Sequence, residues 1–136
     1  TMPRSIDTQT DLINRDKLEK STKDRAENIM IVDLLRNDLS KACKPDSVHV
    51  DHLCEIKSFA GVHHLVSAVS GTLEHDKDAI DVFQACFPGG SITGAPKIRA
   101  MEIIQELEQE PRGPYCGCMG YISFDGNMEM NILIRT

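Results

Sequence analysis

The sequence predicts an α/β fold. The stretch from Lys23 to Leu39 carries apolar residues at helical spacing, and the stretch from Val62 to Leu73 alternates and is rich in β-branched residues. Asp125-Gly126 joins two further strand-like runs, which is a strong signal for a β-hairpin. With 136 residues, 40% of them hydrophobic, the chain can form one domain with a core, or part of one.

Composition excludes several classes of protein. The formal net charge is −6 and the sequence pI is about 5.3, which argues against a general nucleic-acid binder. No apolar run approaches the length of a membrane span, and the chain does not open on a signal-peptide pattern. The five cysteines are odd in number and none forms C-x-x-C, which favours reduced thiols. We therefore expect a cytoplasmic protein that binds neither nucleic acid nor membranes.

The N-terminal third reads as loop, helix, helix. Residues 1–10 are polar and predict a loop, and residues 11–20 predict a charged, solvated helix. Ser21 or Thr22 is a suitable N-cap for a helix over 23–39. Because that helix is apolar over most of its circumference, we expect it to be buried on several sides.

The polar residues of this helix form two sets. Asp33, Arg36 and Asn37 share one side, where a network of ion pairs and hydrogen bonds would anchor a buried helix. Asp24 and Glu27 share another face. Two acids near a helix start either complement the helix dipole or supply oxygen ligands to Mg²⁺. The sequence leaves these two alternatives open.

The middle of the chain is rich in strand signals. We expect short strands over 47–51 and 53–59 and a longer one over 62–73. Since side chains alternate across a strand, His63 and His64 must point to opposite faces. His64 is on the side with the smaller neighbouring side chains. The pattern leaves open whether it is structural or part of a site.

A short helix over 78–86 leads into the glycine loop, FPGGSITGAPKIR at 87–99. We expect Gly89, Gly90 and Gly94 to adopt positive φ or to let the backbone approach a ligand. A helix beginning near Ala95 would then present free N–H groups to an anion, with loop hydroxyls beside them. The alternative is a helix-entry loop without a ligand.

A nucleoside-triphosphate loop is excluded for this segment. Ala95 stands where G-x-x-x-x-G-K-[ST] requires lysine, and Lys97 comes two residues late. If the loop holds a ligand, we expect a smaller anion such as a carboxylate.

The last segment predicts a hairpin of strands over 115–124 and 128–134. Cys116 and Cys118 should face the same way as small packing residues. Arg135 should lie on the strand face opposite the methionines, where it either clamps a carboxylate or borders solvent.

Five segments, taken together and in order, resemble the chorismate-utilising enzyme family. They are KDRAENIMIVDLLRNDL at 23–39, VHHLVS at 62–67, FPGGSITGAPKIRAMEII at 87–104, GPYCG at 113–117 and GYISFDGNMEMNILIRT at 120–136. The resemblance implies the family's α/β fold, in which β-sheets pack face to face with helices outside. It also implies that residues 1–136 are part of a chorismate-binding catalytic domain truncated at both ends.

Within the family, KDRAEN and GGSITGAPK most resemble members that aminate chorismate at C4 to 4-amino-4-deoxychorismate, the precursor of p-aminobenzoate and folate. Members that form anthranilate and release pyruvate are the nearest alternative. A non-catalytic module that binds chorismate or another anion is a third. The resemblance implies Mg²⁺ as cofactor and a glutamine amidotransferase as the partner that supplies ammonia.

The resemblance also assigns residues. It implies catalytic roles for His64 and Glu27, and metal binding by Glu27 with Asp24 beside it. The implied substrate-binding residues are Thr1, Ser91, Tyr115 and Arg135.

Parts of the family's site would lie outside residues 1–136. Its Pro-Ile-Lys-Gly-Thr motif would end at Thr1, and its nucleophilic lysine would precede Thr1 by two positions. That position is a small residue in the anthranilate-forming members. A second pair of metal-binding glutamates would follow Thr136. We therefore expect residues 1–136 by themselves to be inactive.

Overall fold

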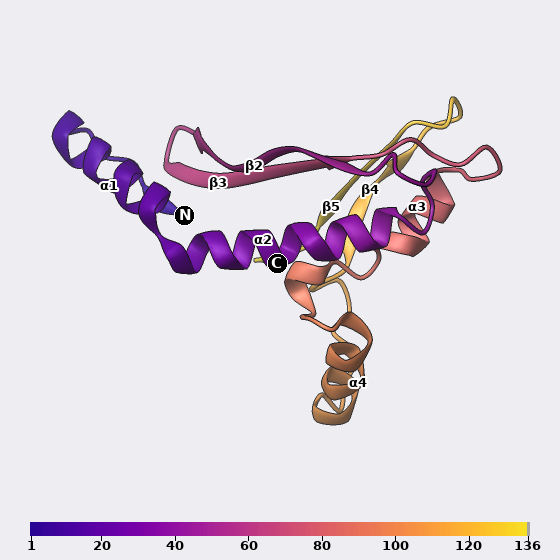
Figure 1. Ribbon diagram of the computed structural model, residues 1–136. Helices are drawn as coiled ribbons and strands as arrows, with labels where there is room; N and C mark the ends of the chain where they lie inside the picture. The colour runs from indigo at the N-terminus through magenta and orange to yellow at the C-terminus, as the bar shows by residue number, and fades with distance from the viewer. Residues whose placement is uncertain (136) are drawn as a thin grey trace. The chain divides into compact units, whose positions relative to one another are not determined.

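The computed structural model describes residues 1–135, and the chain forms two compact units (Figure 1). Unit 1 comprises Thr1–Asp33 and His49–Ser70, and unit 2 comprises Leu34–Val48 and Gly71–Thr136. Helix α2 (Thr22–Leu39) contributes its first part to unit 1 and its last part to unit 2. Each unit contains helices and one antiparallel sheet, so the predicted α/β class is confirmed.

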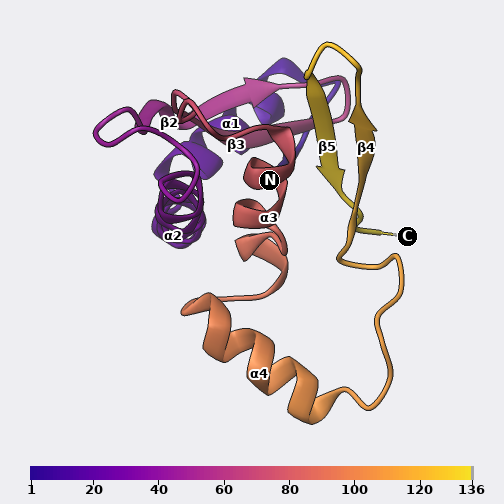
Figure 2. The same cartoon turned by 90° about the vertical axis from the view of Figure 1, so that its right-hand side faces the viewer.

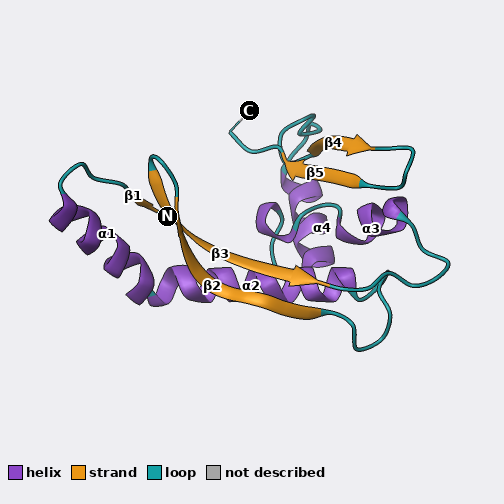
Figure 3. Cartoon of the chain, turned by 90° about the horizontal axis from the view of Figure 1, so that it is seen from above, coloured by secondary structure: helices purple, strands orange, loops and turns teal. Residues whose placement is uncertain are grey.

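Unit 1 is built on a three-stranded antiparallel sheet in the order β1-β3-β2, drawn in orange in Figure 3. Its strands are β1 (Met2–Pro3), β2 (His49–Ser58) and β3 (Val62–Ser70). A tight turn joins β2 to β3 and sets the register that places Ser58 opposite His63 and Lys57 opposite His64. Helix α1 (Thr8–Lys20) completes the unit.

Several sequence predictions for unit 1 are wrong in detail. The predicted loop over residues 1–10 contains β1, and the strand predicted over 62–73 ends at Ser70. Helix α1 begins at Thr8 rather than at residue 11, because the Asp7 carboxylate accepts the N–H of Thr10 and caps the helix. The two short strands predicted over 47–59 are one strand, β2. The pairing of β2 with β3 shifts register twice, and Cys54 within β2 has a φ of +54°. The sequence pattern suggested a break here, but the strand continues through a local irregularity.

Helix α2 begins at Thr22, one residue before the predicted start, and Ser21 is its N-cap as expected, since the Ser21 hydroxyl accepts the N–H of Asp24. In unit 1 Asn28 anchors the helix to the sheet, since its amide donates to the carbonyl of Leu65 and its oxygen accepts the hydroxyl of Ser67. The predicted burial on several sides is wrong for this chain. Val32 is buried, but more than a third of each of three other apolar side chains is exposed: Ile29, Met30 and Leu35.

The buried acid of helix α2 is also not the one the sequence suggested. Asp33, Arg36 and Asn37 are all exposed, so this side of the helix is not buried as expected. Asp38, on the last turn, is only 4% exposed. It therefore needs a cationic partner within unit 2.

Unit 2 contains α3 (Ala79–Cys86), a 3₁₀ turn (Gly90–Ile92), α4 (Lys97–Leu107) and a two-stranded sheet of β4 (Cys118–Ile122) and β5 (Met128–Ile132), seen in Figure 2. Asp78 and Asp81 form a capping box at the start of α3. The predicted hairpin is confirmed, with Gly126 at a φ of +87° and its N–H bonded to the carbonyl of Ser123.

The hairpin strands are shorter than predicted. Cys116 has a φ of +63° and lies before β4, so the prediction that Cys116 and Cys118 share a strand face is wrong. Leu133 bonds back to Gly117 and Cys116 rather than continuing the β4–β5 ladder. All five cysteines are free thiols. Within residues 1–135, no helix is both long and apolar enough to cross a membrane.

Candidate functional site

Three predicted site residues lie together in unit 1. The Thr1 hydroxyl oxygen is 2.9 Å from Nδ1 of His64, and the Thr1 backbone nitrogen is 4.0 Å from an Asp24 carboxylate oxygen. The Ser21 hydroxyl donates to the other Asp24 oxygen. The start of the chain, the start of α2 and the start of β3 thus meet at one place.

The two adjacent histidines have different surroundings, as strand alternation predicted. His63 is 2% exposed, whereas His64 is half-buried. The ring of Phe59 meets His64 edge to face, with the ring centroids 5.8 Å apart. Nδ1 of His64 faces Thr1, and Nε2 has no hydrogen-bond partner within residues 1–135. Nε2 is therefore the nitrogen that can exchange a proton with a ligand.

Glu27 follows Asp24 by three positions on α2 and is exposed. Residues 1–135 offer its carboxylate no hydrogen bond or ion pair, so both oxygens are accessible. Two carboxylates on one helix face fit Mg²⁺, which takes one or two protein carboxylates and completes its shell with water and substrate. The described residues contain no cluster of three or more metal-binding side chains, so any ion here would depend on such additional ligands.

In unit 2 the glycine loop is closely packed. A Cβ atom at Gly90 would lie 2.7 Å from Cδ1 of Leu34, and one at Gly89 would lie 2.7 Å from Cδ1 of Ile132. Gly94 alone of the three has a positive φ, +138°. The predicted positive φ at Gly89 and Gly90 is therefore wrong, and these glycines are required by close contact instead.

Lys97, near the end of this loop, binds groups at both of the loop's ends. Its ammonium pairs with the Asp38 carboxylate and donates to the carbonyl of Cys86 at 3.3 Å, and Lys41 pairs with Asp38 at 2.9 Å. Sequence reasoning considered Lys97 only as a phosphate ligand and missed Asp38. The Lys97 ammonium is instead engaged by protein groups at Asp38 and Cys86.

The loop hydroxyls have separate roles. Thr93 donates to the carbonyl of Gly89 at 3.0 Å and so stabilises the turn, whereas Ser91 is exposed. Burial and the nearby Asp38 carboxylate raise the pKa of the Cys86 thiol at the start of the loop. That thiol stays protonated at neutral pH, which excludes it as a nucleophile.

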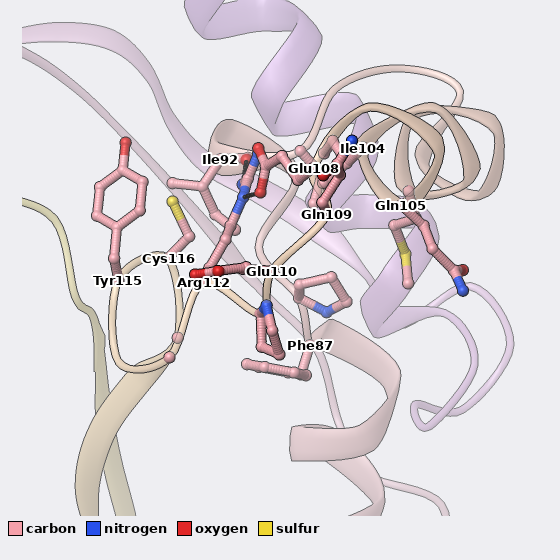
Figure 4. A pocket seen from close by; sticks show the side chains of 16 residues that line it. Phe87, Ile92, Ile104, Gln105, Glu108, Gln109, Glu110, Arg112, Tyr115 and Cys116 are labelled. Carbon is pink, nitrogen blue, oxygen red and sulfur yellow. Dashed lines mark hydrogen bonds and ion pairs between the residues drawn. The ribbon is translucent and has the colours of Figure 1, made fainter.

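A cavity of about 820 Å³ lies beside the loop (Figure 4). The segment after α4 lines it with Tyr115, Cys116 and the paired side chains of Arg112 and Glu108. Contact with the Cys116 thiol raises the pKa of Tyr115, so its hydroxyl remains an O–H donor at neutral pH. The lining of the cavity combines apolar side chains with amide and charged side chains, and the cavity volume lies within the range of small-ligand sites.

Arg112 is a residue of this cavity that sequence reasoning missed. It binds Glu108 through two N–H···O bonds, at 2.7 and 2.5 Å, and donates to the carbonyl of Ile92 at 3.3 Å. This pairing lowers the pKa of Glu108 and links the end of α4 to the glycine loop. The four-residue spacing between Glu108 and Arg112 is the feature of the sequence that could have predicted this ion pair.

Arg135 does not lie on a strand, because β5 ends at Ile132. It is exposed and has a φ of +59°, so its predicted strand position is wrong, while its predicted role in binding a carboxylate is untested. Within residues 1–135, no hydrogen bond or ion pair links Ser91, Tyr115 and Arg135 to one another. The structure thus groups Thr1, Asp24 and His64, with Glu27 nearby on α2, and leaves the three unit 2 residues on separate segments.

Comparison with known proteins identifies the family of this chain. Residues 1–136 match the family described as chorismate binding enzyme. The chain is 54% identical over 136 residues to aminodeoxychorismate synthase component 1 of Klebsiella aerogenes, covering all of this chain and 30% of the relative. It is 48% identical over 136 residues to anthranilate synthase component 1 of Saccharolobus solfataricus, covering 32% of that protein.

A solved structure shows the same fold. The crystal structure of anthranilate synthase component I from Streptococcus pneumoniae TIGR4 has a TM-score of 0.86 and 38% identity, covering 98% of this chain and 32% of that one. The chain therefore spans about a third of the length of the proteins it matches. Its full-length match to the family model and its common fold establish that this chain belongs to the chorismate binding enzyme family.

Proposed function

We propose that the protein aminates chorismate at C4 and forms 4-amino-4-deoxychorismate, the activity of an aminodeoxychorismate synthase component I. The observation that carries the proposal is the 54% identity to aminodeoxychorismate synthase component 1 across the whole chain. The ammonia would come from a glutamine amidotransferase. That partner is suggested only by the word component in the relative's name.

The predicted residues give this proposal its chemistry. Asp24 and Glu27 would hold Mg²⁺, which when bound supplies a Lewis acid for the loss of the C4 hydroxyl. His64 would donate a proton from Nε2 to that hydroxyl, which then leaves as water, because Thr1 occupies Nδ1. Tyr115 would donate its hydroxyl hydrogen to the substrate, and Ser91 would offer a second hydroxyl.

Chorismate carries two carboxylates, which a guanidinium is suited to bind. Arg135 is exposed, whereas the guanidinium of Arg112 is occupied by Glu108. We assign Arg135 to a substrate carboxylate, which a guanidinium can bind through two parallel hydrogen bonds.

Product identity tests the proposal. The intact protein is incubated with chorismate, ammonium and Mg²⁺, and the products are analysed by mass spectrometry and fluorescence. We expect an aminated product that retains the enolpyruvyl group and that a separate lyase converts to p-aminobenzoate. Fluorescent anthranilate with free pyruvate would contradict the proposal and assign the other branch, which the 48% identity to an anthranilate synthase component 1 favours as second candidate.

A binding module without catalysis is the remaining outcome. Chorismate would then bind without turnover, and Glu27→Ala would leave Mg²⁺-dependent chorismate binding unchanged.

A further inference from the structure

The orientation of His64 depends on a contact that the local sequence cannot make by itself. Its Nδ1 meets the hydroxyl of Thr1 at 2.9 Å, and its ring meets the edge of Phe59. Together these contacts fix the ring and leave Nε2 as the available nitrogen. The residues that hold Thr1 and Phe59 in position therefore determine which nitrogen of His64 is available to a ligand.

Strand β1 (Met2–Pro3) places Thr1, because Met2 pairs with His63 and Pro3 with Val62 in β3. Arg4, the residue that follows β1, extends this attachment to the turn between β2 and β3. Its backbone N–H donates to the carbonyl of Gly61 at 3.0 Å, and its Nη1 donates to the carbonyl of Phe59 at 3.0 Å. Arg4 thus fixes the end of β1 and the backbone of Phe59 together.

Asp11 on α1 holds Arg4. Its two carboxylate oxygens accept Nε of Arg4 at 2.9 and 3.1 Å, and one of them also accepts the N–H of Ser5 at 2.9 Å. The same oxygen lies 3.1 Å from Nε2 of His63. Because Arg4, Ser5 and His63 all donate to it, the pKa of Asp11 is lowered to about 2, with Arg4 as the largest cause.

His63 completes the group. Because a carboxylate can only accept, Nε2 of neutral His63 carries the hydrogen and Nδ1 accepts the Ser58 hydroxyl at 2.8 Å. The row Asp11–His63–Ser58 contains the groups of a hydrolytic triad. It does not act as one, since the His63 ring is 2% exposed and no substrate can reach it.

We propose that Arg4 and Asp11 are positioning residues for His64, which act by fixing Thr1 and Phe59 against its ring. The inference rests on the proposed catalytic role of His64, and neither residue touches a substrate. A geometric role of this kind affects the chemical step more than substrate binding, because small displacements of a reacting group reduce rate steeply.

The test compares Asp11→Asn with Asp16→Asn in the intact protein. Asp16 lies on the same helix in an exposed ion pair with Lys20, so it provides the same chemical change without a link to His64. We expect Asp11→Asn to lower kcat about 10- to 100-fold while KM for chorismate changes less than about threefold. Asp16→Asn should match the wild type.

A second variant and a second measurement test the positioning of His64 independently of the proposed function. Arg4→Lys retains the charge but cannot bridge Asp11 and Phe59 through one planar group, so it should behave like Asp11→Asn. The ring-nitrogen NMR signals of His64, assigned by their loss in His64→Gln, should report one tautomer in the wild type and a mixture in Arg4→Lys and Asp11→Asn.

Unchanged His64 signals in folded Arg4→Lys and Asp11→Asn would overturn the inference, whether or not the protein turns over chorismate. Unchanged kcat in an active protein would also overturn it. Altered signals in a protein that does not turn over chorismate would support the positioning and contradict the proposed function instead.

Discussion

The ammonium of Lys97 binds both the Asp38 carboxylate and the carbonyl of Cys86, and so joins the last turn of α2 to both ends of the glycine loop. The Asp38 side chain is 5% exposed and that of Lys97 is 13% exposed. Removing Lys97 from this pair is costly, because the buried Asp38 carboxylate then keeps only Lys41, whose side chain is mostly exposed, as its cationic partner. These contacts hold the two ends of the loop that carries Ser91.

Lys97→Met should lower the free energy of unfolding by about 3–5 kcal/mol, since it leaves Asp38 buried with only one remaining cation. Lys41→Met is the matched control, because Lys41 pairs with the same carboxylate but its side chain is 55% exposed. It should cost less than about 1 kcal/mol. Denaturant unfolding of the intact protein measures both. Equal costs would show that burial of the pair is not the cause.

The glycine loop offers a second comparison. Gly90→Ala would bring a Cβ atom to 2.7 Å from Cδ1 and 3.1 Å from Cβ of Leu34, and the latter atom cannot rotate away. Overpacking of this kind costs about 1–3 kcal/mol. Gly61→Ala has no atom within 4 Å of its new Cβ and should be close to neutral.

Thermal unfolding of Gly90→Ala and Gly61→Ala measures this difference. A Gly90→Ala variant as stable as Gly61→Ala would mean that the loop does not pack on Leu34 in solution.

Local signals in the sequence predicted most of the elements. Ser21, Asp78 and Asp125-Gly126 act within a few residues of themselves, and each cap or turn is where its residue type indicates. The predicted ends of the strands were less accurate. Cys54 and Cys116 adopt positive φ, which no pattern in the sequence predicted.

The supporting contacts could not be predicted in the same way. Asp38 and Lys97 are 59 positions apart, and Asp11 and His63 are 52 apart. The pattern within one helix or strand does not specify a partner so far away in the sequence. Each charged residue could therefore be interpreted only from its position in its own helix or strand. The candidate site residues came from resemblance to a family, and the side chains that hold them in place came only from the fold.

Asp11 also predicts a dependence of stability on pH. Its pKa is lowered to about 2 in the folded protein from an ordinary value of 3.8. The stability it contributes is therefore fully present above about pH 4 and is lost as the pH falls toward 2. The difference in melting temperature between wild type and Asp11→Asn should be largest above pH 4 and should narrow as the pH falls. Asp16→Asn should show no such narrowing, and a difference that stays constant from pH 6 to pH 2 would contradict the prediction.

The metal assignment gives the last prediction. Glu27 is exposed and Asp24 is held by Ser21, so replacing Glu27 should remove a metal ligand without disturbing the fold. Glu27→Gln should raise the Mg²⁺ concentration for half-maximal chorismate turnover at least about 10-fold. Glu19→Gln, an exposed acid on α1, should leave it unchanged. Isothermal titration with Mg²⁺ in the presence of chorismate provides a readout independent of turnover. If Glu27→Gln binds Mg²⁺ as tightly as Glu19→Gln does, the two acids at the start of α2 serve only to complement the helix dipole, which is the other role their position allows.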